Sequence, residues 1–148
     1  MKYGIYYAYW EKEWNGDYKY YIDKISKLGF DILEISCGAF SDYYTKDQEL
    51  IDIGKYAKEK GVTLTAGYGP HFNESLSSSE PNMQKQAISF WKETLRKLKL
   101  MDIHIVGGAL YGYWPVDYSK PFDKKRDLEN SIKNMKIISQ YAEEYDIM

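Results

Sequence analysis

A short apolar run that ends in two glycines and opens into an aromatic loop spans residues 103–115: Ile103-His104-Ile105-Val106-Gly107-Gly108-Ala109-Leu110-Tyr111-Gly112-Tyr113-Trp114-Pro115. This pattern is typical of a buried parallel strand that ends at a ligand pocket. Glycine lets a ligand approach the backbone closely, and Tyr and Trp rings combine flat apolar faces with polar edges. A glycine turn followed by an aromatic surface loop is the alternative interpretation, and both stay open at this point.

The chain around this run alternates between strand spacing and helix spacing of its apolar residues. Strands are predicted over residues 2–9, 31–36, 62–66 and 103–106. A helix with one apolar face is predicted after each strand. The faces of the first two helices are formed by Tyr18, Tyr21, Ile22, Ile25 and Leu28, and by Leu50, Ile53, Gly54 and Ala57. Those of the third and fourth are formed by Ala87, Phe90, Trp91, Leu95, Leu98 and Met101, and by Leu128, Ile132, Met135, Ile138 and Ala142. This βαβαβαβα order predicts a parallel sheet with right-handed crossovers.

Residues with strong preferences for helix ends mark the helix boundaries. Gly29 and Gly61 are predicted to end the first and second helices. The second helix begins with the capping-box sequence Thr45-Lys46-Asp47-Gln48. Pro81 is suited to the first turn of the third helix, and Asp123 to the N-cap of the last.

Two α/β architectures fit this order: a small open doubly wound sheet, or a (βα)4 half of a (βα)8 TIM-type barrel. Every predicted strand leads into unusual residues, at 6–14, 37–38, 67–71 and 107–114. In a barrel these strand ends surround one mouth, whereas an open sheet concentrates its ligand groups at one switch point. The half-barrel is therefore favoured, with residues 1–148 as one domain, since a complete barrel needs about 250 residues.

Composition narrows the class of protein. The net charge of -2 makes nucleic acid an unexpected partner, and no apolar run has the length of a membrane span. The single cysteine, Cys37, rules out an intramolecular disulfide and a multi-cysteine zinc site. The N-terminus lacks the apolar core of a signal peptide, so we expect a cytoplasmic protein. The chain has sixteen tyrosines and four tryptophans, and clusters of aromatic residues at 6–14, 43–44 and 111–118 suit sugar binding or subunit interfaces.

Three motifs resemble those of the ketose 3-epimerases, the family of D-tagatose 3-epimerase and D-allulose (D-psicose) 3-epimerase enzymes. They are Met-Lys-x-Gly-Ile-Tyr-Tyr-Ala-Tyr-Trp at residues 1–10, Leu-Gly-Phe-Asp-Ile-Leu-Glu-Ile at 28–35, and Val-Gly-Gly-Ala-Leu-Tyr-x-Tyr-Trp-Pro at 106–115. The resemblance runs over the whole chain and covers the amino-terminal half of such an enzyme.

The resemblance implies a (βα)8 barrel that forms a homodimer or homotetramer and binds Mn²⁺, with Co²⁺ or Mg²⁺ as substitutes. One glutamate removes the proton at C3 of a ketohexose to give a metal-stabilised cis-enediolate, and a second glutamate returns it on the opposite face. The family's metal ligands, two Glu, one Asp and one His, all belong to the second half. The first of them follows Met148, on a fifth strand that Ile147 is predicted to begin.

The same resemblance assigns a sugar-binding wall to this half. Its residues are Tyr6, Trp14, Gly67, Ala109 and Trp114, with Cys37 and Leu110 nearby. It places no catalytic residue and no metal ligand within the chain. We therefore expect residues 1–148 to be inactive alone and to bind no metal tightly.

Four further residues are weighed from the sequence alone. Glu34 lies within an apolar strand, where it is expected to be a hydrogen-bonding group of the barrel interior, with a stand-in metal ligand as the alternative. His71 on a strand-end loop is expected to be exposed or to support the site, and His104 to be a hydrogen-bonded core histidine. Cys37 is interpreted as a small pocket residue rather than a nucleophile.

Three functional hypotheses follow. The chain is half of a ketose 3-epimerase for D-fructose/D-allulose or D-tagatose/D-sorbose, or a non-catalytic half-barrel that dimerises and binds sugar, or part of another sugar isomerase or epimerase barrel. An isolated half-barrel has open strand edges and an uncovered inner face, so we expect the chain alone to dimerise or aggregate.

Overall fold

A computed structural model describes residues 1–148 except 15, 39, 41–43, 45 and 120–121. Its sheet contains β1 (Gly4–Tyr6), β2 (Ile32–Ser36), β3 (Thr63–Tyr68) and β4 (Val106–Gly108), paired in this order. All three neighbouring pairs are parallel. Consecutive strand order without a switch point is the arrangement of a barrel arc. The predicted (βα)4 architecture is confirmed.

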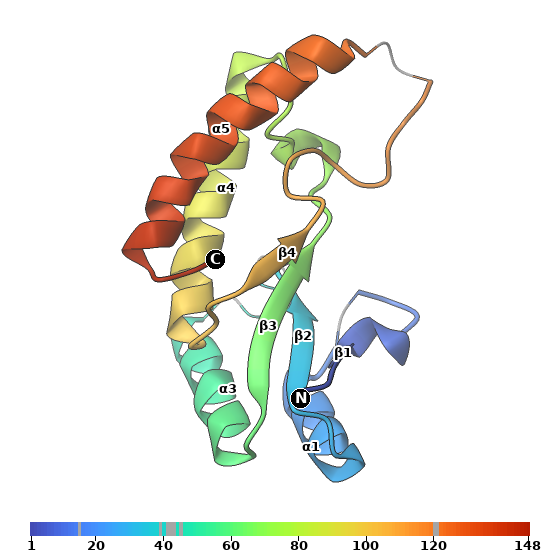
Figure 1. The fold of residues 1–148 in the computed structure, drawn as a ribbon, viewed down its shortest axis with the longest axis vertical. Coiled ribbons are helices and arrows are strands. Elements are labelled where there is room, and N and C mark those ends of the chain that lie inside the picture. The colour runs from blue at the N-terminus through green and yellow to red at the C-terminus, as the bar shows by residue number, and fades with distance from the viewer. Residues whose placement is uncertain (15, 39, 41–43, 45, 120–121) are drawn as a thin grey trace.

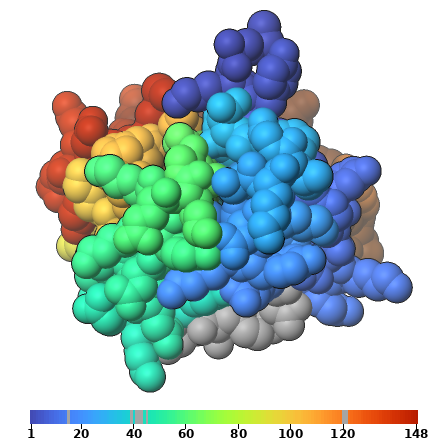
Figure 2. Space-filling model, turned by 90° about the horizontal axis from the view of Figure 1, so that it is seen from below, coloured from blue at the N-terminus to red at the C-terminus, as the bar shows by residue number. Residues whose placement is uncertain are grey.

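The strands are connected by helices, labelled as in Figure 1: α1 (Tyr18–Leu28), α3 (Asp47–Glu59), α4 (Pro81–Leu100) and α5 (Lys124–Glu144). Two short 3₁₀ turns, η1 (Tyr7–Tyr9) and η2 (Phe72–Glu74), follow β1 and β3. The two long helices α4 and α5 pack side by side, and α3 packs between α1 and α4. Figure 2 shows the molecule from the amino ends of the strands, where α1 and α3 meet and the first residues of the chain project. Within the described residues, no helix is long and apolar enough to cross a membrane.

The predicted helix ends at Gly29, Pro81 and Asp123 are confirmed. The predicted capping box is wrong by one residue, because α3 begins at Asp47 and its N-cap, Lys46, makes no side-chain cap bond. Asp17, which was not predicted as a cap, caps α1. The Asp17 carboxylate accepts from the backbone N–H groups of Lys19 and Tyr20 at 3.0 and 3.2 Å, and that of Asp123 accepts from Arg126 at 3.1 Å. Gly29 ends α1 in a left-handed conformation with φ 80°. The predicted cap Thr45, like the aromatic residue Tyr43, lies outside the described residues.

The core lies between the sheet and the helices. Alternate strand residues, such as Leu33 and Ile35 of β2, are buried there in one cluster with Ile25, Leu50 and Trp91 of the helices. The predicted faces of α3 and α4 are confirmed, with Phe90 only half-buried.

Three predicted core positions are wrong, because Leu28, Leu128 and Ile132 are exposed. The buried residues of α5 are instead Ser131, Asn134 and Ile138. Ser131 Oγ donates to the Tyr111 carbonyl at 2.6 Å and Asn134 Nδ2 to the Leu76 carbonyl at 2.8 Å. This helix docks on loop backbone through polar side chains, which a count of apolar residues misses.

The strand boundaries also differ from the prediction. β1 ends at Tyr6, because Tyr7 turns its ring into the core and the chain enters η1. β3 extends to Tyr68. β4 begins only at Val106, but Ala66 N–H already donates to the Ile105 carbonyl at 3.0 Å.

The backbone after α5 lies where a fifth parallel strand would pair. The Met148 N–H donates to the His104 carbonyl at 2.8 Å, and the Val106 N–H donates to the Met148 carbonyl at 2.9 Å. In a parallel ladder, one residue forms hydrogen bonds with the two residues on either side of its partner. Met148 bonds in this way to His104 and Val106, which flank Ile105. The predicted fifth-strand position beside β4 therefore agrees with the backbone hydrogen bonds.

Candidate functional site

A cavity of about 650 Å³ lies at the carboxyl ends of the four strands. It is lined by Tyr6, Glu13, Trp14, Glu34, Ser36, Gly38, Gly67, Tyr68, Gly69, His71, Gly108, Ala109, Trp114 and Pro115. Each strand contributes to this lining, because parallel strands bring their carboxyl ends to one edge of the sheet. The position is that of a barrel mouth.

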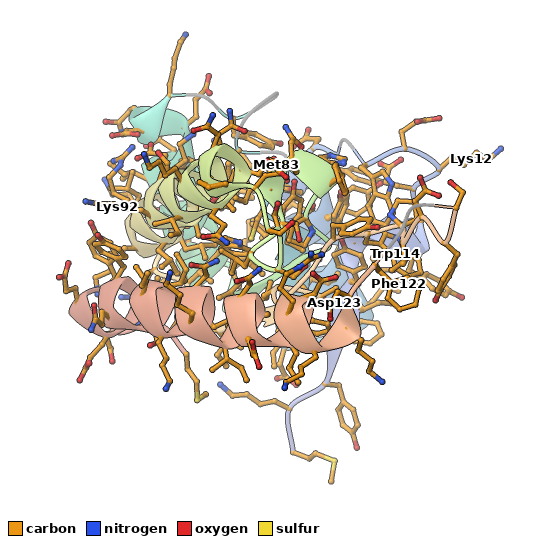
Figure 3. The ribbon with its side chains drawn as sticks, turned by 90° about the horizontal axis from the view of Figure 1, so that it is seen from above. Lys12, Met83, Lys92, Trp114, Phe122 and Asp123 are labelled. Atoms are coloured by element: carbon orange, nitrogen blue, oxygen red, sulfur yellow. The ribbon has the colours of Figure 1, made fainter. Side chains whose placement is uncertain are left out.

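Two tryptophans from opposite ends of the sheet form the outer walls. Trp14 follows β1 and Trp114 follows β4, and their side chains remain 64% and 61% exposed although they line the cavity. In Figure 3, viewed from the carboxyl ends of the strands, Trp114 lies on the same side of the molecule as the loop that carries Lys12. Large exposed aromatic faces beside a cavity are available to stack on a ligand.

Hydrogen bonds hold each tryptophan in place through its backbone. The buried Tyr7 donates its hydroxyl to the Trp14 carbonyl at 2.7 Å, and the Trp14 ring lies 6.3 Å from the ring of Tyr6. The Trp114 N–H donates to the Pro70 carbonyl at 2.7 Å. Gly69 is required at this contact, because a Cβ there would lie 2.9 Å from the Cβ of Trp114.

The floor of the cavity is formed by backbone and short side chains of β2, β3 and β4. Gly108 has φ 110°, and a Cβ there would collide with the carbonyl oxygen of Tyr68. Ala109 N–H donates to that same carbonyl at 3.0 Å. The glycine at the end of β4 thus lets the two strand ends meet beneath the aromatic walls.

The charged groups of the cavity are acidic. Glu13 and Glu34 line it together with His71, and no lysine or arginine is among its described lining residues. Burial, with a smaller contribution from the carboxylate of Glu34, raises the pKa of Tyr6, so this phenol stays neutral. The described lining therefore offers hydrogen-bonding groups but no Lys or Arg to pair with an anionic ligand.

A hydrogen-bonded pair supports the wall beside His71. The Tyr68 hydroxyl donates to the Glu74 carboxylate at 2.7 Å, and the His71 backbone N–H donates to the same oxygen at 2.9 Å. These bonds tie η2 to the end of β3. They leave Glu74 occupied in holding the loop.

The described residues do not form a metal centre. No three His, Cys, Asp or Glu side chains come close enough to hold a metal ion in the part of the chain that the structure describes. The donors that line the cavity, Glu13, Glu34 and His71, are not such a group. These residues do not fit a Mn²⁺ site by themselves, so no chemical step is assigned to a metal held by them.

Five of the seven predicted sugar-binding residues line the cavity: Tyr6, Trp14, Gly67, Ala109 and Trp114. Cys37 and Leu110 are not among its lining residues. Cys37 is fully buried in the core, and that burial raises the pKa of its thiol, which keeps it unreactive. Leu110 is half-buried and packs against the core.

Glu34 and His71 line the cavity. Five further lining residues lie in the strand-end segments that were predicted to surround the mouth, although none was singled out: Glu13, Gly38, Tyr68, Gly69 and Gly108. Ser36 and Pro115 lie just outside those segments. The alternation of side chains along β2 is the sequence signal that identifies Ser36 as a lining residue, since Ser36 lies two residues after Glu34 on the same face. The prediction of a core position for His104 is wrong, because its side chain is 42% exposed. It is hydrogen-bonded as predicted, to Asp102 and Asp146.

A second hollow of about 300 Å³ lies on α4 beside Phe40. Its charged residues are already paired: Lys97 Nζ donates to the Phe40 carbonyl at 2.8 Å, and Glu93 binds Arg96 at 2.8 Å. The larger cavity at the strand ends is therefore the better candidate.

Comparison with known proteins gives concordant matches. A family model for xylose isomerase-like TIM barrels matches residues 22–148. The D-psicose 3-epimerase of Enterocloster bolteae is 55% identical over 148 residues, which are 100% of this chain and 49% of that protein. The D-psicose 3-epimerase of Ruminiclostridium cellulolyticum is 48% identical over 143 residues, 97% of this chain and 48% of that protein.

Among solved structures, D-psicose 3-epimerase with D-tagatose from Clostridium cellulolyticum H10 superposes with a TM-score of 0.96 at 46% identity. The match covers 99% of this chain and 50% of that one. The chain thus spans about half the length of the relatives it matches.

Proposed function

The chain belongs to the xylose isomerase-like TIM-barrel family, and from this premise we propose that the full-length protein containing it is a ketose 3-epimerase. The proposed substrates are free ketohexoses, D-fructose/D-allulose and D-tagatose/D-sorbose. The relatives with 55% and 48% identity carry the name of an enzyme of this kind. In this proposal residues 1–148 supply the wall that binds the sugar.

The observation that carries the proposal is the aromatic cavity, whose described lining residues include no Lys or Arg. Trp14 and Trp114 offer apolar faces to the C–H groups of a sugar, and polar side chains such as Ser36 and Glu34 line the same cavity. A phosphorylated sugar would favour Arg, Lys or a helix N-terminus at the phosphate. The described lining offers no Lys or Arg, so a free sugar fits better than a sugar phosphate.

Epimerisation at C3 moves one proton off the carbon and returns a proton to the opposite face. We propose that the acid–base pair and a divalent cation, Mn²⁺ or in its place Co²⁺ or Mg²⁺, are held by the other half of the full-length protein. The cation would stabilise the negative charge that develops on the sugar oxygens. The residues described here would bind the sugar, orient it and exclude water from one side.

The proposal includes a homo-oligomeric, cytoplasmic enzyme, and it expects the isolated chain to be inactive. A second candidate has one observation in its favour: both aromatic walls come from this chain. Residues 1–148 alone could then bind ketose without chemistry.

One experiment tests both candidates. The full-length protein and residues 1–148 are each incubated with D-allulose and Mn²⁺, and D-fructose is followed by chromatography. Turnover by the full-length protein alone supports the first candidate. If the full-length protein converts none of the four ketohexoses, the first candidate is overturned. Titration of residues 1–148 with the same sugars by calorimetry then decides the second candidate.

A further inference from the structure

Glu34 is a carboxylate on the inner face of the sheet that has no partner in the described chain. It pairs in register with Tyr6 of β1 and Thr65 of β3, in the row of side chains that points away from the helices. Its neighbours Leu33 and Ile35 point the other way and are fully buried. No hydrogen bond or ion pair joins its carboxylate to any residue that the structure describes.

Gly67 determines where that carboxylate lies. A Cβ on Gly67 would be 2.8 Å from Glu34 Oε1, closer than a Cβ approaches a non-bonded atom. Glu34 lies one residue before the position that pairs with Ala66, so its side chain extends along the inner face across β3 toward the mouth. The missing side chain at Gly67 therefore leaves room for the Glu34 carboxylate inside the cavity.

We propose that Glu34, held over Gly67, binds sugar hydroxyl groups and makes the cavity select uncharged sugars against anionic ones. This inference rests on the proposed function. An ionised carboxylate only accepts hydrogen bonds, so it suits the O–H groups of a ketose. No Lys or Arg is among the described lining residues, so none of them offsets the repulsion between this carboxylate and a phosphate or carboxylate group on the ligand.

The proposal assigns different roles to the two residues. Glu34 contacts the substrate. Gly67 acts through Glu34 and is a positioning residue. A purely structural carboxylate would instead pair with another part of the full-length protein, and its loss would affect all ligands alike.

The test uses the full-length protein and Glu34→Gln, which keeps the shape of the side chain and removes its charge. KM and kcat are measured for D-allulose, and inhibition constants for D-fructose 1-phosphate and D-fructose 6-phosphate. We expect KM to rise about tenfold with a smaller change in kcat, since a charge-assisted hydrogen bond is lost. The inhibition constants of the two phosphates should fall several-fold. Glu59→Gln is the matched control, because it removes one carboxylate from the exposed end of α3.

A mutant cycle tests the role of Gly67. Gly67→Ala should raise KM in the protein with Glu34, because the new Cβ displaces the carboxylate. In the Glu34→Ala background the same substitution should leave KM nearly unchanged. Additive effects of the two substitutions would overturn the positioning role. Thermal melting of each variant identifies any that fail to fold.

The outcomes separate this inference from the proposed function. If the unsubstituted protein epimerises no ketohexose, the proposed function fails. If the unsubstituted protein does epimerise a ketohexose, Glu34→Gln tests the role of Glu34 separately. That role is overturned if the substitution leaves the ratio between phosphate affinity and free-sugar affinity unchanged, or lowers both affinities together. The proposed function then still stands.

Discussion

His104 donates from Nδ1 to the backbone carbonyl of Asp146 at 2.7 Å, while its Nε2 lies 3.1 Å from the Asp102 carboxylate. A carbonyl and an ionised carboxylate both only accept hydrogen bonds, so this arrangement needs a hydrogen on each ring nitrogen. Both bonds are made together only when the ring is protonated, so the folded chain favours the imidazolium form. The histidine connects the turn before β4 with the turn after α5, beside the backbone pair between His104 and Met148.

This geometry predicts a pH-dependent contribution to stability. The backbone hydrogen bond to Asp146, and then that to Asp102, raise the pKa of His104 above its ordinary value of 6.5. A raised folded-state pKa contributes stability that is fully present below pH 6.5 and is lost as the pH rises through the folded pKa. The partly exposed site limits the effect to below about 1 kcal/mol.

Urea unfolding of the wild-type chain and His104→Gln at pH 5.5 and pH 8.5 checks this prediction. The free-energy difference between the two proteins should be larger at pH 5.5. Asp102 and Asp146 are the charged groups that face the ring, so Asp102→Asn should reduce the pH dependence. An equal difference at both pH values would contradict the charged pairing.

Tyr7→Phe should loosen the loop that carries Trp14. The Tyr7 side chain is fully buried, and its hydroxyl donates to the Trp14 carbonyl at 2.7 Å. Removal of one partner of this bond should cost about 1 kcal/mol of unfolding free energy and weaken sugar binding, because Trp14 loses its anchor. Urea unfolding and calorimetric sugar titration measure both effects. Tyr20→Phe is the control: Tyr20 lies on the exposed side of α1, so the same hydroxyl loss should change neither quantity.

The sequence was sufficient for the strand order and for most of the cavity wall. Apolar spacing predicts which residues of α3 enter the core, and the glycines after the strands mark the end at which ligand groups gather. Both signals depend on local chemistry: helical periodicity, and the glycine needed where two strand ends meet.

Residues whose position depends on distant partners were not predictable in the same way. Ser131 and Asn134 are buried because they bind loop carbonyls that come from remote parts of the chain. Leu128 and Ile132 have helical spacing and yet remain exposed. Likewise, the role of Gly67 depends on how Glu34 extends from the neighbouring strand, which no spacing within either strand reveals.

Trp114→Ala should weaken sugar binding with little effect on folding. The side chain is 61% exposed, so its loss removes little buried apolar area from the folded chain. It lines the cavity, and the loss of one stacking face should raise the dissociation constant about tenfold. Tyr118→Ala on the same loop is the matched control, since Tyr118 is exposed and does not line the cavity. Equal weakening by both substitutions would show that the loop as a whole, and not the Trp114 ring, determines affinity.

Gly108→Ala should destabilise the end of β4 and with it the floor of the cavity. The backbone at this position has φ 110°, a region that L-residues rarely adopt, and the new Cβ would collide with the Tyr68 carbonyl. Strain of this kind costs about 1–3 kcal/mol before the collision is counted. Gly112→Ala four residues later meets no atom within 4 Å and should change the unfolding free energy by less than about 1 kcal/mol. Urea unfolding of both variants measures the difference. Equal stability of the two would mean that β3 and β4 can separate at their carboxyl ends, and the cavity floor would then not require glycine.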